Sequence, residues 1–188
     1  NVKKALNVEY KSKELYVNNS AVLGSATYAN SQLFELNGLA QGSGSDQRDG
    51  NQVEFKTISC HSYLRLNAPG DSYNVRMMIF KVKNGNGSIP TVPLSLPAGD
   101  VTTAFYDLDF VPQGIQILKD TTFKMDSNTT SKNISFTISR DIKPRYLGAG
   151  GTYTDIAQEG VWCAIMLNGS GGSGILAQTR FRLRYVDN

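Results

Sequence analysis

Short runs in which apolar and polar residues alternate restrict the fold of this chain more than any other feature. Residues 132–140 set Ile134, Phe136 and Ile138 against serine and threonine. Residues 175–186 alternate in the same way. Successive side chains of a β-strand point to opposite faces of the sheet, so each run predicts a strand with one buried face. We therefore expect an all-β fold.

Clusters of glycine, asparagine, aspartate and proline separate further strand candidates. We predict strands at residues 31–37, 52–67, 73–83, 115–125, 132–140, 160–167 and 175–186. Residues 73–83 and 160–167 are almost continuously apolar, which predicts strands covered on both faces and places Trp162 in a core. The apolar parity changes near Thr57, which predicts a β-bulge. Only residues 97–112 are compatible with a short helix.

With a first strand near the N-terminus, this pattern amounts to about eight strands and favours an antiparallel sandwich or barrel. The uneven loop lengths favour a single eight-stranded antiparallel jelly roll over a regular up-and-down barrel. The length of 188 residues suits one domain. We expect residues 1–20 to form an N-terminal arm or first strand, and residues 21–188 to form the jelly-roll domain.

The composition argues against several functional classes. His61 is the single histidine, which excludes a metal centre built from several imidazoles. Any catalytic triad that contains a histidine would have to use His61. It follows Cys60 in a predicted strand, so the two side chains point to opposite faces and cannot form a dyad. Cys60 and Cys163 form no CxxC motif, and we expect both to be small buried residues. No apolar run approaches a membrane span of about 18 residues. We expect neither an enzyme nor a membrane partner.

The net charge of +3 is mild, so it permits a nucleic acid as a partner but does not require one. Arg180, Arg182 and Arg184 alternate with apolar residues, so they should line one face of a strand. That face is either simply solvated or contacts phosphates, which requires positive charge but no base recognition. The candidate nucleic-acid-binding residues are Lys3, Lys4, Lys11, Lys13, Arg180, Arg182 and Arg184.

Three segments, in this order and at this spacing, carry a resemblance to a known family. They are a Gly-rich loop with a Gln-Arg-Asp-Gly turn at residues 41–53, VRMMIFK at residues 75–81, and ILKDTTF at residues 117–123. Together with the final RYVDN, they resemble the capsid proteins of satellite necrosis-type viruses and the related capsids of small circular single-stranded DNA viruses. The resemblance extends from about residue 38 to the C-terminus.

The resemblance implies a jelly roll of the viral capsid type that builds a small icosahedral (T = 1) shell of about 60 copies. Such a coat protein encapsidates viral nucleic acid without sequence preference and is a component of the virion. By the same resemblance, Gln47, Arg48 and Asp49 would lie at a subunit interface. Replacing Arg48 would then weaken particles and leave the fold intact, although Arg48 could also be a plain turn residue.

Capsids of this kind often hold calcium between neighbouring subunits, and the matching ligands here would be Asp49, Gln52 and Asp187. The alternative for Asp187 is an ion pair with an arginine, or solvation. The alternative function is a secreted jelly-roll recognition domain, either a lectin or a trimeric ligand.

Overall fold

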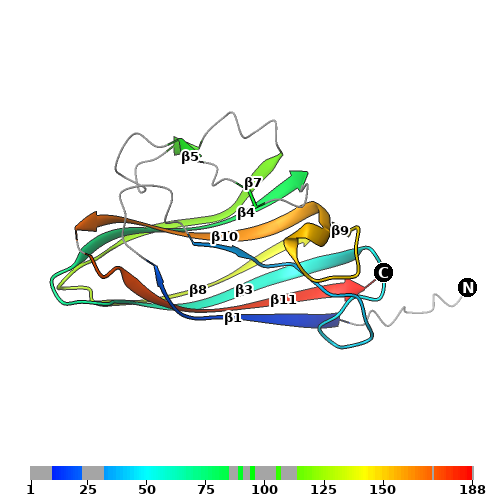
Figure 1. Cartoon of the computed structure of the whole chain (residues 1–188), viewed down its shortest axis with the longest axis horizontal. Coiled ribbons are helices and arrows are strands. Elements are labelled where there is room, and N and C mark those ends of the chain that lie inside the picture. Colours follow the sequence, from blue (N-terminus) through cyan, green and yellow to red (C-terminus); the bar gives the residue numbers. More distant parts are fainter. Residues whose placement is uncertain are drawn as a thin grey trace, which may run out of the picture.

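The chain folds into two antiparallel β-sheets packed face to face (Figure 1). The computed structural model describes residues 10–22, 32–84, 89–90, 94–95, 105–106, 114–170 and 172–187. The first sheet has the order β1-β11-β3-β8. Its strands are β1 (Tyr10–Val22), β11 (Ile175–Asp187), β3 (Val53–Leu66) and β8 (Ser131–Ile142). The second sheet has the order β2-β10-β4-β7. Its strands are β2 (Gln32–Glu35), β10 (Ile156–Ser170), β4 (Ser72–Asn84) and β7 (Ile115–Met125).

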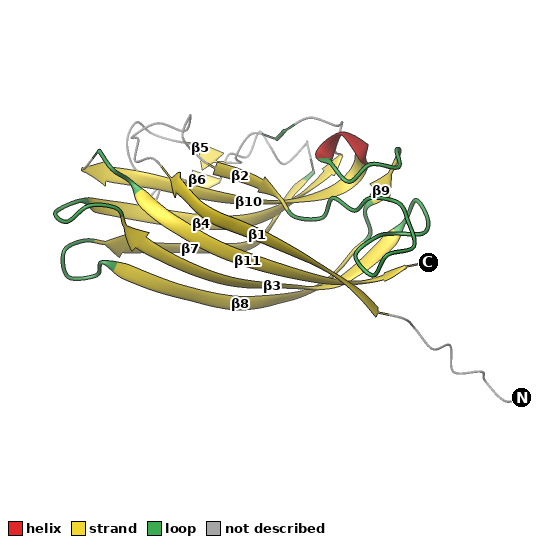
Figure 2. Ribbon diagram, turned by 60° about the horizontal axis from the view of Figure 1, so that its bottom comes forward, coloured by secondary structure: helices red, strands yellow, loops and turns green. Residues whose placement is uncertain are grey.

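The strand order identifies the fold as a jelly roll. Among the eight strands named above, the chain changes sheet at every connection except the one from β4 to β7, which pair within the second sheet. Figure 2 shows the first sheet along its length, with β1 at one edge and β8 at the other. Two antiparallel sheets connected by crossovers from one sheet to the other form the double Greek-key arrangement of a jelly roll. The predicted fold class is confirmed.

Short elements complete the architecture. Strands β5 (Leu94–Ser95) and β6 (Phe105–Tyr106) pair with each other, and β9 (Arg145–Tyr146) pairs with β10 beside a 3₁₀ turn at Tyr153–Asp155. Apart from β6, the segment in which a helix was conceivable, residues 97–112, lies outside the described residues. No helix in the described part of the chain has the length and apolar character needed to cross a membrane.

The main core lies between the two sheets. Its central side chains are inward-facing residues of β3, β4, β10 and β11, all of them at most 1% exposed: Phe55, Ile58, Cys60, Met77, Ile79, Cys163, Ile165, Phe181 and Leu183. Cys60 and Cys163 are both free thiols. The prediction that they are small buried residues is confirmed, and burial raises the pKa of the Cys60 thiol to about 12.

A second apolar cluster covers the other face of β4 and β10. It contains Met78, Phe80, Val82, Trp162, Ala164 and Met166. Strand β4 is therefore buried on both faces, as its nearly continuous apolar sequence predicted. Trp162 is buried in this cluster, with 6% of its surface exposed, so its predicted core position is confirmed. Figure 1 shows β5 above this face of the second sheet.

The predicted bulge is present in β3. The pairing of β3 with β11 skips Lys56, because Phe55 and Thr57 pair with the consecutive residues Tyr185 and Arg184. The pairing of β3 with β8 shifts register at the same point. The extra residue lets Phe55 and Ile58 both face the core although they are three positions apart.

Strand β1 forms the edge of the first sheet and pairs along its length with β11. The boundary predicted between residues 20 and 21 falls inside this strand. Residues 1–9 are outside the described part of the chain, and so are the candidate residues Lys3 and Lys4.

Candidate nucleic-acid interface

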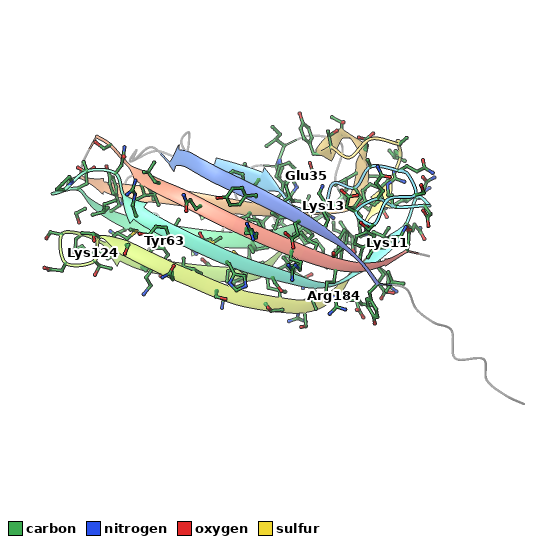
Figure 3. All side chains as sticks on the ribbon, turned by 90° about the horizontal axis from the view of Figure 1, so that it is seen from below. Lys11, Lys13, Glu35, Tyr63, Lys124 and Arg184 are labelled. Carbon is green, nitrogen blue, oxygen red and sulfur yellow. The ribbon has the colours of Figure 1, made fainter. Side chains whose placement is uncertain are left out.

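The face of the first sheet that points away from the core carries the predicted arginines. Along β11, Arg180, Arg182 and Arg184 are exposed while the residues between them are buried. We call this surface the arginine face. It also carries, from β1, β3 and β8, the residues Tyr10, Ser12, Glu14, Tyr16, Ser59, His61, Tyr63, Asn133, Ser135 and Thr137. The predicted alternation of the three arginines is confirmed, and Figure 3 shows Tyr63 and Arg184 on this side.

Two of the three arginines contact tyrosine rings. The guanidinium of Arg180 lies 5.4 Å from the ring centroid of Tyr16, and that of Arg184 lies 5.2 Å from the ring of Tyr10. Arg182 instead donates two hydrogen bonds to Glu14 Oε1, at 2.8 and 2.5 Å. In the described residues, Arg180 and Arg184 form no ion pair with a carboxylate. Their charge is therefore available to an anion from outside the chain.

A hollow of about 620 Å³ lies in the middle of the arginine face. It is lined by residues from all four strands, including Tyr16, His61, Tyr63, Asn133 and Arg180. The lining contains two arginines and no aspartate or glutamate. Its volume lies in the range of pockets that hold small ligands, roughly 300–1,000 Å³.

The structure separates Lys11 and Lys13 from the arginines. Both side chains share the inward parity of Leu15, which packs against the core. Lys11 Nζ lies 3.0 Å from Asp187 Oδ2 and 3.2 Å from Asp49 Oδ2, and its hydrogen bond to Asp187 raises its pKa. Lys13 Nζ donates to the carbonyl oxygen of Gly38, and burial lowers its pKa. Lys11 and Lys13 therefore do not share a surface with the arginines, because they point to the other side of β1. Their contact with nucleic acid stays a prediction.

Glu35 lies beside Lys13 at the edge of the sandwich (Figure 3). Its Oε1 atom is buried and has no hydrogen-bond partner among the residues that the structure describes. Burial raises the pKa of this carboxyl from 4.5 to about 7, against the opposing effect of the Lys13 ammonium. Because the pKa of Glu35 differs between the folded and unfolded chain, its titration makes the free energy of unfolding depend on pH.

We predict that stability falls as the pH rises from about 4.5 to 7. In this window the unfolded Glu35 loses its proton before the folded one does, which favours unfolding. Glu35→Gln should remove that loss and raise stability at pH 8 by about 1 kcal/mol, a value reduced for solvent screening. Thermal melts between pH 4.5 and 8 measure the difference, with Glu14→Gln as the exposed control. A gain from Glu35→Gln that is the same at every pH would contradict this account.

Arg48 is the centre of a buried loop cluster at one end of the sandwich. Its side chain is fully buried, and its Nε donates to Leu39 O at 3.0 Å. Its two terminal nitrogens donate to the carbonyl oxygens of Gly50 and Gly148. The guanidinium also lies 4.3 Å from the ring centroid of Tyr146. Arg48 thus joins the 38–51 loop to the loop between β9 and β10.

This role changes the expectation for Arg48. The guanidinium makes its hydrogen bonds and its ring contact within the chain. Replacing Arg48 is therefore expected to destabilise the fold itself. Gln47 and Asp49 flank it, with Asp49 exposed and Gln47 half-buried. The prediction that this turn contacts a neighbouring subunit therefore concerns Gln47 and Asp49, and it stays a prediction.

The structure brings two of the three predicted calcium ligands together. Asp187 Oδ2 accepts hydrogen bonds from Lys11 Nζ at 3.0 Å and from the backbone N–H of Asp49 at 2.6 Å. Gln52 is exposed and pairs with Arg145 in an isolated bridge. The partner of Asp187 is a lysine, where the sequence suggested an arginine.

This donor set does not fit calcium within one chain. The Lys11 ammonium already occupies the place between the two carboxylates, whereas calcium requires six to eight oxygen ligands. In the described residues, no group of three or more His, Cys, Asp or Glu side chains could hold a metal ion. Calcium shared between subunits stays a prediction.

His61 lies on the arginine face, and its Nδ1 is 3.1 Å from Ser135 Oγ. Cys60, the neighbouring residue, is buried in the core on the other side of β3. The prediction that these two side chains point to opposite faces is confirmed.

Sequence reasoning missed the tyrosines of the arginine face. Tyr16 and Tyr63 are 55% and 40% exposed, and they flank the hollow from β1 and β3. Their parity within each strand was visible in the sequence. Their position beside Arg180 depends on strand pairing, which the sequence pattern alone does not specify.

The chain matches no family model and no curated protein. Among solved structures, it is similar to dimeric latent PorU from Porphyromonas gingivalis, at 10% identity and a TM-score of 0.40, over 96% of this chain and 13% of PorU. It is similar to infectious bursal disease virus Gx strain, at 7% identity and a TM-score of 0.40, over 95% of this chain and 32% of that chain. A third similarity is to Cocksfoot mottle virus, at 11% identity and a TM-score of 0.39, over 96% and 95% of the two chains. These values assign no family, so the fold assignment above depends on strand order alone.

Proposed function

We propose that the chain is the coat subunit of a small icosahedral virus. In this role it associates with copies of itself into a closed shell, and its arginine face holds the viral nucleic acid. The role is mechanical and involves no catalytic step, and the protein would be a component of the virion. The jelly roll is also used by lectins and cupins, so the fold alone does not decide between these functions.

The observation that carries the proposal is the charge of the arginine face. Arg180 and Arg184 have no carboxylate partner in the described part of the chain, and the hollow beside them has no acidic lining residue. Phosphate binding requires positive charge and no specific base contacts. Arg180 and Arg184, which lie on an open sheet face, meet that requirement.

Self-association would use loops and strand ends. Asp49 and Leu147 are exposed at the end of the sandwich that contains the Arg48 cluster, and Leu147 is 71% exposed. A closed shell repeats one modest contact many times, so no single large apolar face is required.

The first test is assembly of the expressed chain. We expect a megadalton species on size exclusion and closed particles in negative-stain micrographs. After nuclease treatment, the particles should retain protected nucleic acid. A monomer or trimer that binds oligosaccharides would instead favour the recognition-domain alternative and contradict the proposal.

We predict that changing Arg180, Arg182 and Arg184 together to glutamine lowers the nucleic acid retained per particle. In binding assays, the slope of log K against log salt should fall by about 1.4, at roughly 0.7 for each of the two arginines, Arg180 and Arg184, that have no carboxylate partner in the described residues. The matched control changes Lys124, Lys132 and Arg140 to glutamine, which removes the same charge from exposed positions outside the hollow. Equal losses in the two triple variants would show that net charge, and not the arginine face, determines packaging.

A further inference from the structure

The aromatic rings on the arginine face are not required for phosphate binding. A phosphate contact needs charge or a hydrogen-bond donor, and a tyrosine supplies one hydroxyl donor but no charge. Yet Tyr16 and Tyr63 expose about half of their surface, 55% and 40%, on either side of the same hollow. Their presence indicates a ligand with an apolar, flat part as well as an anionic part.

Strand pairing arranges the hollow as a row of aligned side chains. Tyr16 pairs with Arg180, Arg180 pairs with His61, and His61 pairs with Ser135. Adjacent strands lie about 4.8 Å apart, so the row spans roughly 14 Å across the sheet. It places an aromatic ring, a guanidinium, an imidazole and a hydroxyl side by side.

The next row, about 7 Å along the strands, holds a second tyrosine between two side-chain amides. There Gln178 pairs with Tyr63, and Tyr63 pairs with Asn133. Each row thus offers one tyrosine for stacking and polar groups beside it. The two rows together line the hollow of about 620 Å³.

The Tyr16 ring is also held in place. The Arg180 guanidinium lies 5.4 Å from its centroid, a cation–π contact that limits the motion of the ring. A ring that is already ordered loses less conformational entropy when a ligand stacks on it.

We propose that the arginine face binds single-stranded nucleic acid by stacking bases on Tyr16 and Tyr63 while Arg180 contacts the phosphates between them. This inference rests on the proposed function and adds to it a preference for single strands over duplexes. Unpaired bases can be splayed onto aromatic side chains of an open sheet, whereas a duplex keeps its base faces covered. A duplex could therefore use only the arginines.

The charge distribution favours a nucleic acid over a neutral oligosaccharide. A neutral sugar would also stack on tyrosine, but it would leave the Arg180 charge without an anion. In the described residues, one carboxylate on this face lies within 4 Å of an arginine. It belongs to Glu14, which forms an ion pair with Arg182.

The test compares the full chain with its tyrosine variants in fluorescence anisotropy. The probes are a labelled 12-nucleotide oligothymidylate and a 12-base-pair duplex, at fixed salt, and light scattering monitors particles. We expect Tyr16→Ala with Tyr63→Ala to weaken single-strand binding at least about tenfold. Duplex binding should change less than about twofold, because it depends on the arginines. The matching phenylalanine variants keep the stacking surface and should retain single-strand affinity.

Each outcome has a separate meaning. Equal loss of single-strand and duplex binding would overturn the stacking role, as would unchanged single-strand binding or failure of the phenylalanine variants to retain it. Competition by a neutral oligosaccharide in place of the oligonucleotide would overturn it too. Particle formation is measured independently by microscopy, so stacking can fail while the coat function stands. Melting curves show whether the alanine variants remain folded, and Tyr16→Ala alone provides a second, milder variant.

Discussion

Replacing Arg48 by alanine should lower the free energy of unfolding by about 3–5 kcal/mol, because several buried acceptors lose their donor at a cost of roughly 1–3 kcal/mol each. The substitution leaves the carbonyl oxygens of Leu39, Gly50 and Gly148 without their donor in a buried site. It also removes the stacking contact with Tyr146. For a domain of this size, the melting temperature should fall by about 10 °C.

Thermal denaturation of the purified variant measures this loss. Arg140→Ala is the matched control because Arg140 is exposed on β8, and it should change stability by less than about 0.5 kcal/mol. Arg48→Lys should also be strongly destabilising, since a single ammonium cannot reproduce the guanidinium fork. A melting temperature for Arg48→Ala close to that of the unchanged protein would refute the structural role.

The second large effect is expected at Arg76 and Asp120, which form a buried ion pair between β4 and β7. Arg76 Nε lies 3.0 Å from Asp120 Oδ1, and Nη2 lies 2.6 Å from Oδ2. The two side chains are 7% and 18% exposed. Arg76→Ala should cost about 3–5 kcal/mol, because it removes one partner of a largely buried ion pair.

The double variant Arg76→Met with Asp120→Leu separates the value of the pair from the cost of breaking it. Replacing both charges with apolar groups removes the desolvation penalty, so most of the stability should return. Chemical denaturation of the single and double variants gives the two free energies. A double variant as unstable as the single one would mean that the pair itself stabilises the fold.

Most of the fold could be predicted because its determinants are local. The period-two alternation in β8 and β11 is a property of a few consecutive residues, and it correctly indicated which side chains face the core. The parity change near Thr57 likewise located the bulge. The uneven loops then favoured a jelly roll, which the strand order confirms.

The candidate site could be predicted only in part. The sequence indicated that Arg180, Arg182 and Arg184 share a face, because all three lie on one strand. It gave no sign that Lys11 points away from them, because an edge strand can turn either face to the core until its partner is known.

The sequence by itself determined the strands, their buried faces and the row of arginines, since these follow from spacing along the backbone. Only the tertiary structure decided which residues meet across strands. The pairing of Tyr16 with Arg180 joins positions 164 residues apart, and Arg48 reaches Gly148 across 100 residues. Such contacts depend on register and loop packing, which the whole core sets by burying every apolar face at once.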